Sequence, residues 1–290
     1  MTWLIEPFEH AFMRQAFAAS LLISLCCSLL GPHVVLRRMA FLGDALAHAA
    51  LPGLVAAWML GTSLFGGALA AGLITASGIS WLGHRRLLRE DTAIGVLHSG
   101  MLALGVLLIS ATSSFRDFSR MLFGNVFGIS KMELTGIAAV ALLIALLLRL
   151  FRKELLLTAL DPAHAQVIGL SPGRIRTLLL FMLTLTVVTA IQAVGVVLTT
   201  ALLVTPSASA VVVGAPLRSM WKIAFAISAG SSIIGLYASW HVDVSGGSAI
   251  VVCCSSCFAV MLAWQHFGRK KSRIPRKTRE AGGDSSDTFR

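Results

Sequence analysis

The sequence predicts an all-α, polytopic membrane protein with eight or nine transmembrane helices. Hydrophobic residues make up 56% of its 290 residues and charged residues only 13%, whereas a soluble domain carries about 25% charge. Several uninterrupted apolar runs reach about twenty residues, the length that crosses a bilayer core of about 30 Å as a helix. This composition excludes a soluble enzyme, a secreted disulfide scaffold and a disordered protein.

Apolar runs of this length fill the first half of the chain, with basic residues after the first, third and fifth of them. The polar stretch 112–131 separates the fourth run from the fifth. Each run predicts one membrane-spanning helix, and together they cover residues 16–36, 39–60, 64–82, 93–111 and 134–150.

The second half contains one segment, residues 177–214, that carries no charge at all. As a single helix it would measure about 57 Å, which is too long for one crossing. We therefore expect it to break, at Gly195 and Pro206, because glycine and proline interrupt helices. Two more runs follow, one that comes after Arg218 and Lys222 and ends at about Trp240, and one over 248–267.

The basic clusters predict the orientation, because positive residues concentrate on the cytoplasmic side of membrane proteins. This rule gives nine crossings with the N-terminus outside, or eight if one segment is re-entrant or interfacial. The stretch 112–131 then faces outward despite Arg116, Arg120 and Lys131, which is a mild conflict. The rule places residues 37–38, 84–89, 149–176, 218–222 and 269–279 in the cytoplasm.

The net charge of +11 is partly a property of the C-terminal segment. We predict a transmembrane domain over residues 1–267 and a basic, disordered cytoplasmic tail over 268–290, which can rest on anionic lipid headgroups. No aromatic or motif signal accompanies the charge, so nucleic acid is not an expected partner.

One acidic residue, Asp44, lies within a predicted span. In a helix that starts at Met39, Asp44 lies about 7.5 Å and His48 about 13.5 Å along the axis, the latter near the bilayer midplane. An acid is costly there unless it faces a partner or a wet pathway. The two side chains share a helix face, and a carboxylate with an imidazole suits Mn²⁺, Zn²⁺ or Fe²⁺.

Two readings of this pair stay open at this point: a metal site, or an Asp–His hydrogen bond that joins two helices. Two ligands are too few for a metal ion, so a metal site needs a second helix or a second copy of the chain. Pro52 lacks the N–H that would occupy the His48 carbonyl, so we expect that carbonyl to be free to face an ion. Gly43 and Gly53 are expected to allow close approach of neighbouring helices.

Three further residues are weaker metal candidates. His98, in the fourth run, could face the same pathway, although a hydrogen bond in helix packing is the commoner role. His241 and Asp243 fall in a predicted outer loop, where they could receive a cation at the mouth of a pathway.

The connection at 152–176 contains a short predicted helix over 162–168. Asp161 suits its N-cap, Pro162 its first position and Gly169 its C-terminal cap. On the cytoplasmic side this helix either only shapes the surface or docks a soluble partner.

The sequence lacks three motifs that would indicate a catalytic chain: G-x-x-x-x-G-K-[ST], H-E-x-x-H and G-x-S-x-G. Without the first, the chain cannot bind ATP by a P-loop, and without the others an intramembrane protease is disfavoured. We expect no enzymatic activity and no permanently bound cofactor, so any energy must come from an ion gradient or another subunit.

Residues 41–53, Phe-Leu-Gly-Asp-Ala-Leu-Ala-His-Ala-Ala-Leu-Pro-Gly, strongly resemble the second-helix motif of the manganese/zinc/iron permeases of ABC transporters. The likeness continues in order and spacing at residues 91–95, 122–125, 192–195 and 201–206. It covers residues 12–265, and these collinear motifs are far more specific together than any one of them.

The resemblance implies an ABC importer permease fold in the inner membrane of a bacterial cell. It implies a second permease, identical or paralogous, two ATP-hydrolysing subunits on the cytoplasmic face and an extracytoplasmic metal-binding receptor. Asp44 and His48 fall on the family's metal-pathway positions. The segment from Asp161 to Gly169, which includes Ala165, matches the coupling helix that docks on the ATPase.

The prediction is therefore a permease subunit that conducts Mn²⁺, Zn²⁺ or Fe²⁺ and has a cytoplasmic C-terminus. An importer driven by an ion gradient, a permease for metal chelates and a membrane scaffold that transports nothing are the alternatives. Carboxylate and imidazole suit all three cations, so the choice among them stays open.

Overall fold

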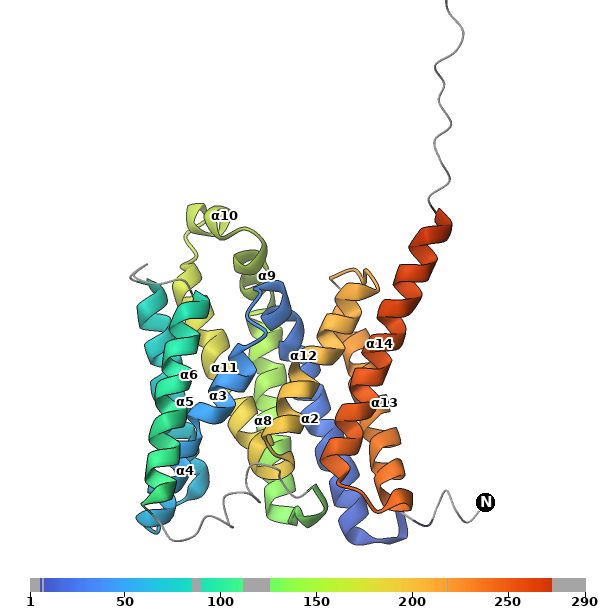
Figure 1. The fold of residues 1–290 in the computed structure, drawn as a ribbon. Helices are drawn as coiled ribbons and strands as arrows, with labels where there is room; N and C mark the ends of the chain where they lie inside the picture. The colour runs from blue at the N-terminus through green and yellow to red at the C-terminus, as the bar shows by residue number, and fades with distance from the viewer. Residues whose placement is uncertain (1–5, 7, 85–89, 112–125, 218, 273–290) are drawn as a thin grey trace, which may run out of the picture.

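The computed structural model describes residues 6, 8–84, 90–111, 126–217 and 219–272. These residues form a bundle of helices, shown in Figure 1, and no strand occurs among them. The all-α prediction is confirmed, and each predicted apolar run corresponds to at least one helix. The helices are α2 (Ala11–Leu36), α3 (Leu42–Ala49), α4 (Leu51–Met59), α5 (Leu64–His84), α6 (Glu90–Ser110), η1 (Val126–Gly128), α8 (Lys131–Leu150), α9 (Arg152–Leu160), α10 (Pro162–Val167), α11 (Pro172–Val194), α12 (Val196–Val212), α13 (Met220–Val242) and α14 (Gly246–Ser272).

The number of crossings follows from the helix lengths and from where the first and last described helices lie. Within the described ranges, 8 helical segments are long and apolar enough to span a membrane, and α3 and α4 count as one of them. The helix α12 is a further apolar segment of 17 residues. In Figure 1, α2 starts at one end of the bundle, and α14 finishes at the other end, which also carries α10. This arrangement favours the nine-crossing alternative, with α12 as the short crossing.

The centre of the bundle is formed by α2 and α11. Most of their residues are buried, whereas only 22% of the most apolar stretch of α6, α8 and α14 is buried. The outer helices therefore present apolar side chains to the surroundings, as expected of a protein whose solvent is lipid. On the inside, the hydroxyl groups of Ser24 on α2 and Ser232 on α13 lie 3.1 Å apart and hydrogen-bond across the interface, where no water is available to replace that bond.

A close crossing of α4 and α5 confirms the expectation for Gly53. A Cβ added at Gly53 would lie 2.7 Å from both the carbonyl carbon of Gly67 and the Cβ of Ala71. Gly43 is also in close contact, but with the end of the Leu203 side chain on α12. Gly53 therefore allows the backbone of a neighbouring helix to come close, whereas Gly43 is approached only by a side chain that can move.

The break predicted at Gly195 is present, and the break predicted at Pro206 is not. Gly195 separates α11 from α12 with φ 85° and ψ 170°, a conformation that is essentially restricted to glycine. The helix α12 continues through the buried Pro206. The second prediction was wrong because proline removes only one backbone hydrogen bond, which packed membrane helices tolerate.

Some predictions concern segments at the edge of the described residues. The helix α14 runs to Ser272 and so passes the predicted domain boundary at residue 267. Residues 273–290 of the predicted tail and residues 112–125, with Arg116, Arg120 and the 122–125 motif, lie outside the described residues. The division of the chain at residue 267 stays a prediction.

Candidate functional site

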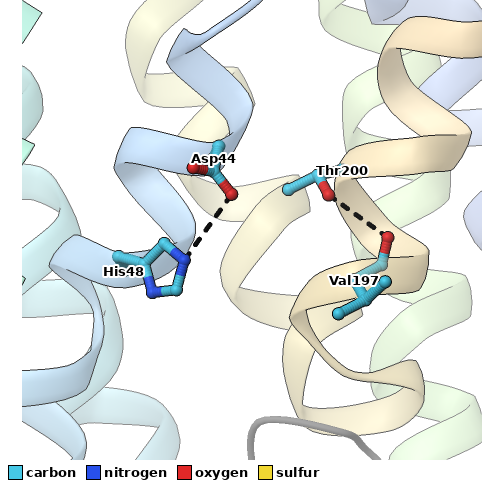
Figure 2. Close-up of polar contacts among 4 residues, drawn as sticks. All are labelled: Asp44, His48, Val197 and Thr200. Carbon is cyan, nitrogen blue, oxygen red and sulfur yellow. Dashed lines mark hydrogen bonds and ion pairs between the residues drawn. The ribbon is translucent and has the colours of Figure 1, made fainter.

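The Asp44 and His48 side chains project from the same face of α3, as the spacing predicts (Figure 2). Asp44 Oδ1 and His48 Nε2 lie 3.6 Å apart, and the two side chains retain 36% and 25% of their exposure. A carboxylate that is this exposed on a membrane-spanning helix needs water, an ion or another chain against it. The pair is therefore not enclosed within a single copy of the chain.

The helix that carries the pair starts later than the sequence predicts. It begins at Leu42, after turns over residues 37–41 that include Arg38 at φ 58°. Asp44 lies in its first turn, about 3 Å from the first residue, and His48 about 9 Å from it. The depths estimated from a start at Met39 were wrong. Because Asp44 lies in the first turn of α3, the positive end of the helix dipole stabilises its carboxylate.

The His48 carbonyl is not free, contrary to expectation. The chain turns at Ala50, and a backbone N–H in this cap donates to the His48 carbonyl oxygen. Pro52 lies at the start of the next helix, α4, where its missing N–H is not needed. The prediction failed because the helix ends before Pro52, and a tighter turn supplies the donor that proline lacks.

His98, from α6, lies directly beside the pair. The centroids of the His48 and His98 rings are 5.3 Å apart, edge to face, and the Phe41 and His98 ring centroids are 5.2 Å apart in the same geometry. The Nδ1 atoms of both histidines are buried, and neither has a hydrogen-bond partner in the described ranges. The structure thus unites Asp44, His48 and His98 from two helices that are distant in sequence.

The helix α12 packs against α3 near the pair. Figure 2 shows Thr200 there, whose hydroxyl donates to the Val197 carbonyl at 3.2 Å. Thr200 lies one turn before Leu203, the residue that contacts Gly43 on α3. Sequence reasoning missed Thr200, although the break at Gly195 sets where α12 begins and therefore which of its residues face α3.

The remaining metal candidates lie elsewhere. His241 is exposed in the last turn of α13, and Asp243 follows it in a left-handed conformation. This is the end of the bundle opposite α10 (Figure 1). Their role in receiving a cation stays a prediction.

The described part of a single copy does not present a complete metal site. Among the residues that the structure describes, no group of three His, Cys, Asp or Glu side chains could hold a metal ion. Asp44, His48 and His98 are neighbours, but they need further ligands or a rearrangement to bind one.

The short helix in the 152–176 connection is α10, and its predicted caps are confirmed. Asp161 Oδ1 accepts a hydrogen bond of 2.9 Å from the His164 N–H, and Pro162 follows in the first turn. At the other end Gly169 has φ 85°, and the Leu170 N–H donates to the Ala165 carbonyl at 2.9 Å, as in a Schellman cap. Ala165 is fully buried, so its small side chain anchors the helix.

The C-terminal end of α10 exposes two apolar side chains beside the polar His164 and Gln166. Val167 and Ile168 are 84% and 54% exposed, at the tip of the bundle in Figure 1. Exposed apolar side chains on an otherwise ordered, capped helix are typical of a contact surface.

A polytopic helical bundle, an open carboxylate–imidazole pair and a projecting capped helix together define a membrane transport protein. The chain belongs to the ABC 3 transport family, whose model matches residues 9–265. This is a family of transport permeases rather than of enzymes, and the resemblance noted in the sequence is confirmed.

Relatives and a solved structure match nearly the whole chain. Manganese transport system membrane protein MntC of Halalkalibacterium halodurans is 38% identical over 256 residues, which cover 88% of each chain. Chelated iron transport system membrane protein YfeD of Yersinia pestis is 36% identical over 268 residues, covering 92% of this chain and 90% of that protein. The structure of PsaBC from Streptococcus pneumoniae in complex with Fab matches with a TM-score of 0.81 and 32% identity, over 93% of this chain and 98% of that one.

Proposed function

We propose that this chain forms the ion pathway of an ATP-driven importer of Mn²⁺, Zn²⁺ or Fe²⁺, in which Asp44 and His48 contact the passing ion. The geometry of this pair carries the proposal, because its side chains lie 3.6 Å apart and stay partly exposed. A structural clamp between helices would bury both groups and pair their polar atoms, whereas His48 Nδ1 has no partner in the described ranges. The names of the relatives, which include manganese and iron transport, indicate the class of ion.

The incomplete ligand set supports a pathway that is shared between two permeases. Mn²⁺, Zn²⁺ and Fe²⁺ need at least four ligands, water included. We infer that a second permease, identical or paralogous, faces the open side of Asp44 and His48. His98 is then a third ligand or a group that sets the orientation of His48.

The helix α10 supports coupling to a separate ATPase. Its caps stabilise the helix, and the Val167 and Ile168 side chains at its end are exposed. We infer that this surface docks on an ATP-binding subunit, whose closure tilts α10 and switches access to the metal site.

Coupling to a cytoplasmic ATPase also gives the orientation. The end with α10 is then cytoplasmic, as is the C-terminus, and the opposite end is where an extracytoplasmic metal-binding receptor docks. His241 and Asp243 lie at that opposite end, where a released cation would first meet the permease. The proposed location is the inner membrane of a bacterial cell.

Transport by the reconstituted complex tests the site. We expect Asp44→Ala and His48→Ala each to lower ATP-driven Mn²⁺ uptake into proteoliposomes by at least about tenfold, because each removes a ligand, while subunit assembly is retained. His98→Leu is expected to reduce uptake less. Glu9→Gln and His266→Ala are matched controls, because both residues are exposed and far in sequence from the site.

The outcomes separate the alternatives. Full uptake by both alanine variants would remove the site assignment. Uptake by the chain without any ATPase would support an importer driven by an ion gradient, and no metal accumulation with all subunits present would support a scaffold. Competition among Mn²⁺, Zn²⁺ and Fe²⁺ in the same assay identifies the preferred cation.

A further inference from the structure

A cavity of about 360 Å³ lies between the ends of α2, α8, α9 and α13. These ends belong to the same end of the bundle as α10 (Figure 1). The cavity is thus set apart from Asp44 and His48, whose helix α3 packs on α6, α11 and α12. Its volume falls in the range of small-ligand sites, about 300–1,000 Å³.

The wall of the cavity is mostly apolar, and its polar side chains are His33, Arg149 and Arg152. Leu29, Pro32 and Leu36 of α2 form one side, with Trp221 of α13 opposite and Arg149 and Arg152 at the junction of α8 and α9. Leu29 lies about 10 Å deeper along α2 than Leu36. The wall therefore runs from the level of the helix ends into the apolar part of the bundle.

The positive charge at the rim is not neutralised within the described part of the chain. Arg149 and Arg152 are exposed, and no described hydrogen bond or ion pair engages either of them. Among the residues that the structure describes, no acidic residue lines the cavity. Glu154 is the acid nearest in sequence, but its Oε2 is buried and has no partner among the described residues. Lys222 adds a third cation, with its Nζ 5.7 Å from the centre of the Trp221 ring.

We propose that this cavity binds one anionic phospholipid from the leaflet on the α10 side. Its phosphate group would lie between Arg149 and Arg152, and the first part of an acyl chain would lie along Leu29 and Pro32. Basic side chains at the membrane surface attract anionic headgroups, and arginine pairs with phosphate through two parallel N–H donors. The apolar wall of the cavity can contact the acyl chain of a lipid, whereas a free phosphate ion has no apolar part to bind there.

The position of this lipid connects it to the coupling segment. Arg152 begins α9, and α9 leads directly into α10. Arg37, at the end of α2, already ties α9 to α2 by donating to Thr158 Oγ1 at 2.8 Å. A phosphate that bridges Arg149 and Arg152 would brace the α8–α9 junction in the same way.

Native mass spectrometry of the purified full chain tests the proposal, with phosphatidylglycerol and phosphatidylcholine as probes. We expect selective retention of phosphatidylglycerol, and about thirtyfold weaker retention by the variant Arg149→Gln/Arg152→Gln. This factor follows because each basic side chain contributes about 1 kcal/mol to lipid binding, and about 1.4 kcal/mol changes the affinity about tenfold. Lys153→Gln/Arg174→Gln is the matched control, because it removes two exposed charges from the same end of the bundle without touching the cavity.

A second variant tests the binding of the acyl chain to the apolar wall separately from the binding of the phosphate to the arginines. Ala145→Phe fills the cavity wall and is expected to abolish phosphatidylglycerol retention with both arginines intact, at an unchanged melting temperature. Equal retention of phosphatidylcholine, equal loss in the control, or retention by Ala145→Phe would overturn the proposal. Binding of inorganic phosphate at the same affinity would show that an ion, not a lipid, occupies the rim.

Discussion

The crossing of α4 and α5 predicts that Gly53→Ala is strongly destabilising. A Cβ at this position would lie 2.7 Å from the Gly67 carbonyl carbon and 2.7 Å from the Ala71 Cβ. Carbon atoms in contact are separated by about 3.5–4.0 Å, and the Gly67 carbonyl oxygen lies closer to the added Cβ than either carbon, so the two helices must move apart by at least about 0.8 Å. Neither neighbour is the flexible end of a side chain, so no rotamer change can absorb the overlap.

The cost follows from that displacement. A gap of about 0.5–1 Å forfeits a quarter to a half of each affected dispersion contact, and it opens the whole α4–α5 interface rather than one contact. We expect Gly53→Ala to lower the free energy of unfolding by about 3 kcal/mol, at the upper end of the range for overpacked cores. Gly43→Ala should cost less, because the Leu203 side chain can move away.

Thermal unfolding of the purified protein in one detergent measures this difference. Gly100→Ala is the control, because nothing lies within 4 Å of its added Cβ and alanine is the better helix former. It should leave the melting temperature unchanged or raise it.

Coupling between the two glycines gives a sharper test. A Cβ at Gly67 would meet the same crossing from the other side, 2.5 Å from the Ala57 Cβ. Gly67→Ala should therefore be destabilising too, and the double variant should cost less than the sum, because one separation accommodates both methyl groups. A melting temperature for Gly53→Ala at or above that of the wild type, or strict additivity, would refute the reasoning.

The remaining predictions concern Gly195 and α10. Gly195→Ala should lower the free energy of unfolding by about 1–3 kcal/mol, because φ 85° with ψ 170° is closed to residues with a Cβ. Thermal unfolding checks this, with Gly230→Ala as the control, since Gly230 is a helical glycine with open space around it. Equal melting temperatures for the two variants would contradict the prediction. Val167→Asp should weaken binding of the ATPase subunit by at least about tenfold, since it places a charge in the proposed contact. Co-purification with the ATPase measures that loss, Val213→Asp at another exposed position is the control, and undiminished co-purification would remove α10 from the interface.

The sequence predicted the parts of the fold that depend on local rules. Apolar runs located the spanning helices because a helix in lipid must satisfy its own backbone and present apolar side chains. The caps of α10 were predictable because Asp161, Pro162 and Gly169 act within one turn of the residues that they cap. The shared face of Asp44 and His48 followed from helical periodicity alone.

Features that depend on tertiary structure were not predictable from local rules. Pro206 stays inside α12 because its neighbours hold that helix, which no local pattern records. The turn at Ala50 that occupies the His48 carbonyl depends on where α3 begins and ends. His98 could be named as a candidate, but its place beside His48 depends on how α6 packs on α3.

The length of α12 has a consequence for the bilayer around it. At 17 residues it measures about 25 Å, less than the thickness of about 30 Å of a hydrocarbon core. If α12 reaches the surface on the α10 side, the reversal at Gly195 lies below the opposite surface, where peptide groups outside a helix need protein or water as partners. A funnel of water that dips to this reversal would bring the hydrated ion closer to α3, and the distance it must travel without its solvent shell would be correspondingly short.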